Sequence, residues 1–132
     1  MDKRVFSVLV IDNEPDVLKS IQYCLRSSGL KLTMTEDPKK GLELARTIEP
    51  DVILCDAAMP GLSGSQVISM LKEDAVTARI PTVLMTAVAE AHMFSHVPWT
   101  GFLSKPFTAQ ELREAIVSAA KTAVPKSEEQ VP

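Results

Sequence analysis

The chain has few cysteines and no surplus of positive charge. It contains 2 cysteines, and its 14 Lys and Arg residues face 17 Asp and Glu residues, for a formal net charge of −3. Two cysteines cannot form a disulfide framework, so we interpret Cys24 and Cys55 as small buried residues of a protein in the reducing cytoplasm. Lys and Arg are scattered along the chain, which argues against direct binding of nucleic acid.

A long apolar run is also missing. No stretch approaches the roughly 20 residues that cross a bilayer, and residues 1–4 do not have the pattern of a signal peptide, so we expect no membrane association. The spacing of a Cys and His metal site is absent as well. His92 and His96 stand four positions apart with Glu90 as the acidic residue near them, and we interpret them as solvated side chains.

Over the length of one domain, the chain alternates between strand-like and helix-like sequence patterns. Its 132 residues are 45% hydrophobic and 23% charged, enough for one domain with a proper core. Short apolar runs, typical of strands covered on both faces, alternate with segments of helical periodicity. This alternation predicts an α/β fold with a parallel sheet and right-handed crossovers. The expected strands are residues 5–11, 30–34, 51–55, 80–85 and 101–104.

The expected helices differ in how well their ends are marked. Pro15 stands at the first position of the first helix, which Gly29 ends, and Thr108 with Glu111 forms the pattern of a capping box for the last one. The fourth, over 88–97, is expected to be short or irregular.

Pro98 cuts that fourth helix, and Trp99 follows it. We interpret Trp99 as filling the gap beside the short helix, with a role as a partner anchor as the alternative. Residues 123–132 lack apolar periodicity, which predicts a domain over 1–122 and then a disordered tail or the start of a linker.

Polar side chains stand where four of the expected strands end. These residues are Asp12, Asp56, Thr86 and Lys105. In an open parallel sheet the carboxyl ends of the strands face one crevice, in which ligands bind. Two carboxylates, a hydroxyl and an ammonium in such a crevice suit a divalent cation and a phosphoryl group.

The same residues give the chain a resemblance to a known family, the receiver domain of two-component response regulators. The resemblance covers residues 5 to about 122 and implies a flavodoxin-like, doubly wound fold with strand order 2-1-3-4-5 and five helices. It implies a phosphoprotein in a phosphorelay, not an enzyme beyond self-catalysed phosphorylation and dephosphorylation. Its partners would be a sensor histidine kinase or phosphotransfer protein and an output domain or partner protein. The motifs that carry it are Asp12-Asn13-Glu14-Pro15, Asp56 with Met59-Pro60-Gly61 and Gly64, Thr86-Ala87 and Lys105-Pro106-Phe107.

The resemblance implies that Asp56 accepts the phosphoryl group and that Thr86 and Lys105 contact its oxygens. A carboxylate suits this role because it can attack phosphorus and form an aspartyl phosphate. The implied cofactor is Mg²⁺, which keeps several waters and needs few protein ligands. Its implied ligands are Asp12, Asn13, Asp56 and the backbone carbonyl of Ala58.

A conformational switch and a cis peptide bond are implied as well. On phosphorylation Thr86 would move toward the phosphate, and the ring of Phe102 would swing into the vacated space. The peptide bond between Lys105 and Pro106 would be cis.

Two departures from the family pattern leave an alternative open. A second acid is usual at the position of Asn13, and the stretch from Thr86 to Lys105 is roughly one helical turn shorter than usual. Both fit a pseudo-receiver, a protein-interaction module that does not depend on phosphorylation, whereas the intact Asp56 favours a phosphoacceptor. An aspartate-nucleophile hydrolase would need a second acid where this chain has Ala58, and no phosphate loop of a flavodoxin follows the first strand.

Overall fold

A computed structural model describes residues 5–87 and 100–122 of the chain. Their elements are β1 (Ser7–Ile11), α1 (Pro15–Leu25), β2 (Lys31–Thr35), α2 (Pro38–Ile48), β3 (Val52–Asp56), α3 (Gly64–Glu73), β4 (Thr82–Ala87), β5 (Gly101–Lys105) and α4 (Ala109–Thr122). The expected helix over 88–97, with His92, His96, Pro98 and Trp99, and the expected tail 123–132 lie outside the described residues. None of the helices described is long and apolar enough to cross a membrane.

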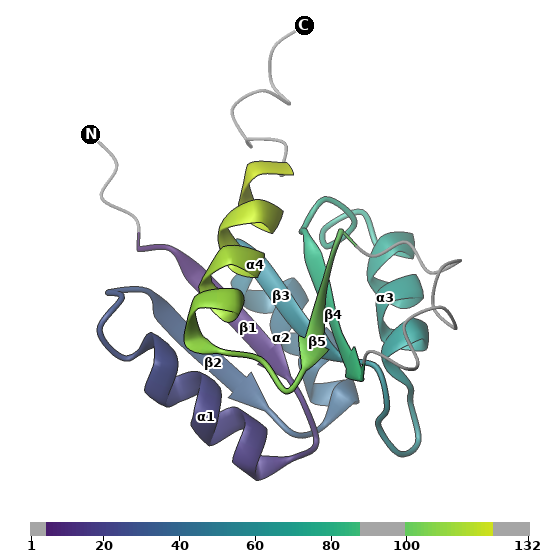
Figure 1. Cartoon of the computed structure of the whole chain (residues 1–132). Helices are drawn as coiled ribbons and strands as arrows, with labels where there is room; N and C mark the ends of the chain where they lie inside the picture. The colour runs from purple at the N-terminus through teal and green to yellow at the C-terminus, as the bar shows by residue number, and fades with distance from the viewer. Residues whose placement is uncertain (1–4, 88–99, 123–132) are drawn as a thin grey trace, which may run out of the picture.

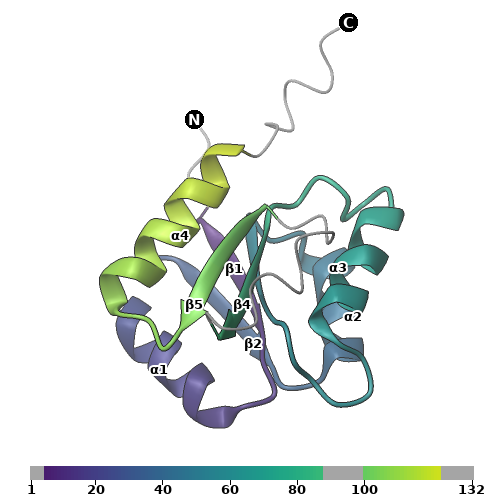
Figure 2. The ribbon, with the colours of Figure 1, turned by 45° about the vertical axis from the view of Figure 1, so that its right-hand side comes forward.

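The five strands form one parallel sheet in the order β2-β1-β3-β4-β5. Helices α1 and α4 cover one face of this sheet, and α2 and α3 cover the other (Figures 1 and 2). This arrangement confirms the predicted flavodoxin-like α/β fold. Because the chain runs outward from β1 in both directions, the strand order reverses between β1 and β3, and ligands of such sheets bind at this point.

Alternate residues of each central strand point to opposite faces of the sheet, and each face has its own part of the hydrophobic core. Val8 and Val10 of β1 point to the side of α1 and α4, whereas Leu9 and Ile11 point to the side of α2 and α3. All four are fully buried. Burial on both faces explains why the strands are apolar runs rather than alternating sequences.

The last helix begins where the sequence predicted. The Thr108 N–H donates to Glu111 Oε1 at 2.8 Å, and the Glu111 N–H donates to Thr108 Oγ1 at 3.1 Å, which confirms the capping box of α4. The expected end of α1 at Gly29 is wrong, because the helix ends at Leu25. There the Ser28 hydroxyl donates to the Leu25 carbonyl at 2.6 Å, a local bond that replaces the next helical turn.

The strand boundaries are shifted toward the carboxyl ends. β1 begins at Ser7 rather than residue 5, whereas β3, β4 and β5 extend through the polar residues that were expected to follow them. Asp56 pairs with Met85, and Ala87 pairs with Lys105. These polar residues are therefore held by the sheet itself rather than by the loops.

Candidate functional site

The two buried aspartates meet at the point where the strand order reverses. Ile11 of β1 pairs with Cys55 of β3, so the next residues, Asp12 and Asp56, are neighbours at the carboxyl end of the sheet. Asp12 is 0% exposed and Asp56 is 4% exposed. Two carboxylates buried side by side repel each other, so their burial requires positive charge nearby.

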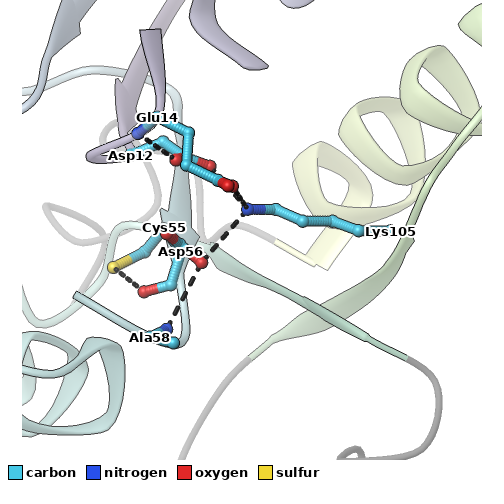
Figure 3. A network of polar contacts seen from close by, with 6 residues as sticks. All are labelled: Asp12, Glu14, Cys55, Asp56, Ala58 and Lys105. Carbon is cyan, nitrogen blue, oxygen red and sulfur yellow. Dashed lines mark hydrogen bonds and ion pairs between the residues drawn. The ribbon is translucent and has the colours of Figure 1, made fainter. Parts of the chain in front are cut away.

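Lys105 supplies that charge from the far side of β4. Its side chain reaches across the end of the sheet to the carboxylates (Figure 3). Its Nζ atom lies 2.9 Å from Asp12 Oδ2, 3.1 Å from Glu14 Oε1 and 3.2 Å from Asp56 Oδ1. One ammonium thus joins three carboxylates, two from the segment after β1 and one from the end of β3. The peptide bond between Lys105 and Pro106 is cis.

The environment of Asp56 makes its charge unfavourable. Burial and the charge of Asp12 raise the pKa of Asp56 from 3.8 to about 6, although Lys105 and the Ala58 N–H, which donates to Oδ1 at 3.3 Å, act in the opposite direction. For Lys105, burial alone would lower the pKa, but its hydrogen bond to Asp12 and the charges of Asp12 and Asp56 raise it overall. The ammonium is therefore charged, and Asp56 is largely ionised at neutral pH.

Asp12 is oriented by the first turn of the helix that follows it. The Glu14 N–H donates to Asp12 Oδ1 at 2.9 Å, which leaves Oδ2 facing Lys105. Glu14 is the N-cap of α1, but its side chain accepts no capping hydrogen bond. That side chain is 59% exposed and extends to the ammonium (Figure 3). Sequence analysis quoted Glu14 in the Asp12-Asn13-Glu14-Pro15 motif but did not assign it as a ligand; the signal was its position two residues after Asp12.

Cys55 lies beside the site without the properties of a nucleophile. Its Sγ donates to the Asp56 carbonyl at 3.6 Å, and the residue is fully buried. Burial first, then the charges of Asp56 and Asp12, raise the pKa of the thiol, so it stays protonated. Cys55 is thus a buried structural residue, as predicted, and the other free cysteine, Cys24, is partly buried.

The remaining predicted residues surround this cluster. Thr86 is 3% exposed in β4 and follows Met85, the register partner of Asp56. Phe102 is partly buried in β5 and lines a shallow groove along α4. Among the described residues, the partners of the Lys105 ammonium are carboxylates, and the amide of Asn13 is not one of them. The roles of Thr86, Asn13 and Phe102 stay predictions.

Gly64, which sequence analysis quoted in the Asp56 motif without a role, is the first residue of α3. Its N–H donates to the Ala57 carbonyl at 3.0 Å. A Cβ atom at this position would overlap the carbonyl oxygen of Asp56. The absence of a side chain therefore lets α3 begin directly on the backbone that carries Asp56. The signal in the sequence was the capping box of Ser63 and Gln66 around this glycine.

The donor set fits a small hard cation. Carboxylate oxygens of Asp12, Glu14 and Asp56 all lie within 4.8 Å of one another. Oxygen ligands of this type are those that Mg²⁺ prefers. The position of the Lys105 ammonium among the same oxygens is a further sign that positive charge is stable there.

Comparison with known proteins identifies a family and several relatives. Residues 8–117 match the family described as the response regulator receiver domain. The chain is 31% identical over 127 residues to the phosphate regulon transcriptional regulatory protein PhoB of Klebsiella pneumoniae, covering 94% of this chain and 56% of PhoB. It is 35% identical over 79 residues to protein PilH of Pseudomonas aeruginosa, covering 60% of this chain and 65% of PilH. The matched parts of the chain thus cover less than two thirds of the length of each of these relatives.

Solved structures share the fold. The chemotaxis response regulator CheY4 of Vibrio cholerae superposes with a TM-score of 0.79 at 21% identity, covering 88% of this chain and 99% of that one. The receiver domain of a Pseudomonas aeruginosa sensor histidine kinase, solved with a magnesium ion in its active-site cleft, has a TM-score of 0.82 at 23% identity, covering 89% and 99%. The match over residues 8–117 shows that the chain belongs to the response regulator receiver domain family.

Proposed function

We propose that Asp56 is the phosphoacceptor of this receiver domain. In the proposed reaction an Asp56 carboxylate oxygen attacks the phosphorus of a histidine phosphate. The new O–P bond forms as the P–N bond of the donor breaks, and the histidine nitrogen leaves and takes up a proton. The observation that carries the proposal is the buried Asp56 carboxylate with the Lys105 ammonium 3.2 Å from its Oδ1.

The surrounding residues support this chemistry through charge and hydrogen bonding. Lys105 is placed to offset negative charge on the phosphoryl oxygens, and a hydroxyl from Thr86 would contact another of them. Asp12 and Asp56 would hold Mg²⁺, with Asn13 and the Ala58 carbonyl as expected ligands. When bound, Mg²⁺ neutralises charge on the phosphoryl group.

The partners and the output follow from the same proposal. The donor would be a sensor histidine kinase or a phosphotransfer protein in the cytoplasm. Phosphorylation would shift the population of two conformations through Thr86 and Phe102, and a further domain or a partner protein would detect the shift. Catalysis by the chain would be limited to its own phosphorylation and dephosphorylation. The alternative, a pseudo-receiver, gives no role to the convergence of Asp12, Asp56 and Lys105 on one point.

Intact mass spectrometry tests the proposal. The protein is incubated with acetyl phosphate and Mg²⁺, and we expect a gain of one phosphoryl group. Asp56→Asn should abolish the gain. The matched control is Asp51→Asn, which changes a carboxylate just before β3, at the opposite end of that strand, where its oxygen accepts the Ser7 N–H at 2.7 Å. No gain in wild type at saturating donor would favour the pseudo-receiver.

A further inference from the structure

We infer that Glu14 is a ligand of the cation at this site and supplies a carboxylate that its neighbour Asn13 lacks. The inference rests on the proposed function, because it concerns the same cation. Its basis is the Glu14 Oε1 atom, which lies 3.1 Å from the Lys105 Nζ atom that Asp12 and Asp56 also contact.

The three oxygens are already close to the spacing that a magnesium ion needs. Ligands at 2.0–2.1 Å in an octahedron are about 2.9 Å apart when adjacent and about 4.2 Å apart when opposite. The oxygens of Asp12, Glu14 and Asp56 lie within 4.8 Å of one another. The Asp12 and Asp56 side chains are buried, so Glu14, with its long and 59% exposed side chain, is the ligand that can adjust.

Glu14 contributes to the site twice. Its backbone N–H holds Asp12 Oδ1, which turns Asp12 Oδ2 toward the cluster. Its own carboxylate then reaches the same point, since no capping hydrogen bond of α1 engages it. Asn13 is uncharged, and its amide is not a partner of Lys105 among the described residues. A third negative charge at the site therefore comes from Glu14.

Lys105 and the cation must share these oxygens. The ammonium occupies the point where Asp12, Glu14 and Asp56 converge, so Lys105 has to release Asp12 and Glu14 before their oxygens bind a cation. The released ammonium stays within reach of Asp56, where the phosphoryl group would form. We therefore expect Lys105→Met to bind Mg²⁺ more tightly than wild type, by about threefold to tenfold, because the competing charge is gone.

Isothermal titration of Mg²⁺ into the phosphate-free protein tests the role of Glu14. Glu14→Gln should weaken binding by about fivefold to tenfold. The matched control is Asp16→Asn, which removes an exposed carboxylate from the first turn of the same helix, outside the cluster. Asp16→Asn should change the affinity by less than about twofold, because a solvated charge at that distance is screened. Equal affinities of the two variants would overturn the inference.

Two further measurements keep the outcome unambiguous. Circular dichroism checks that each variant is folded; if Glu14→Gln is not, Glu14→Asp replaces it. Glu14→Asp keeps the charge but withdraws the carboxylate, and an affinity equal to that of wild type would overturn the inference.

Phosphorylation of wild type by acetyl phosphate is followed separately. If Asp56 is phosphorylated while Glu14→Gln binds Mg²⁺ normally, the inference fails and the proposed function stands. If wild type is not phosphorylated at saturating donor, the proposed function fails.

Discussion

The Lys105 ammonium lies 2.9 Å from a carboxylate oxygen of Asp12, a residue 93 positions earlier in the chain. This ion pair connects the carboxyl ends of β1 and β5, two strands that are not neighbours in the sheet. Asp12 is fully buried, and such a charge is stable only when it is paired. The pair thus places compensating positive charge beside Asp56 before any ligand is bound.

Removing this ammonium should destabilise the fold. Lys105→Met leaves the buried carboxylates of Asp12 and Asp56 without this ammonium, and we expect the free energy of unfolding to fall by about 3–5 kcal/mol at pH 7 without divalent cations. Urea denaturation measures the change. Added Mg²⁺ should restore part of the loss by binding the folded state. Lys19→Met, an exposed lysine on α1, is the control, and a similar loss in that variant would contradict the account.

The charge of Asp56 should oppose folding. Its folded pKa of about 6 lies above the ordinary 3.8, so the native state holds the proton more tightly than the unfolded state. The group therefore stabilises the fold below about pH 4, and this contribution is lost as the pH rises through about 6. Asp56→Asn should thus raise the free energy of unfolding by about 1–3 kcal/mol at pH 7, in chelator, and by little at pH 4. A gain of the same size at both values would show that the ionised carboxylate is not its cause.

Gly64 should be required for the geometry of Asp56. Gly64→Ala introduces a Cβ that overlaps the Asp56 carbonyl oxygen, and overpacking of this kind destabilises by about 1–3 kcal/mol. We also expect slower phosphorylation by acetyl phosphate. The matched control is Gly101→Ala in β5, where the nearest heavy atom to a new Cβ is Val83 Cγ2 at 3.4 Å. The control should stay within about 1 kcal/mol of wild type. Equal effects at both glycines would show that the contact with Asp56 is unimportant.

The phosphorylated state should be long-lived because of Ala58. The Ala58 N–H donates to Asp56 Oδ1, but its methyl side chain has no group that could orient an attacking water. Ala58→Asn should speed loss of the phosphoryl group by on the order of threefold to tenfold, measured by intact mass after removal of the donor. Ala75→Asn makes the same change at an exposed position after α3 and should leave the decay unchanged. Rapid decay in wild type that Ala58→Asn does not alter would refute this prediction.

Sequence analysis identified most residues of the site, but it did not predict which of them are in contact. Asp12, Asp56 and Lys105 were recognisable because each follows an apolar run, and a parallel sheet brings such ends together. The strand ends were placed too early, because apolar character stops before the backbone pairing does. Asp56 and Lys105 still pair with Met85 and Ala87 across β4.

Two contributions could not be read from sequence patterns. Glu14 was quoted in the first motif without a ligand role, and its distance to Lys105 depends on how β5 lies relative to β1. Gly64 was quoted in the Asp56 motif without a role, and its contact with the Asp56 backbone depends on how closely α3 approaches β3. The first joins residues 91 positions apart, and the second depends on the packing of two consecutive elements; local periodicity encodes neither.

Chemical trapping at Asp56 tests the central claim most directly. After incubation with acetyl phosphate and Mg²⁺, borohydride reduces an acyl phosphate to an alcohol, so a phosphorylated aspartate becomes homoserine. Peptide mapping by mass spectrometry then identifies the position. The account predicts homoserine at position 56, dependent on donor and on Mg²⁺. Unmodified Asp56 at saturating donor, or homoserine at Asp12 instead, would contradict it.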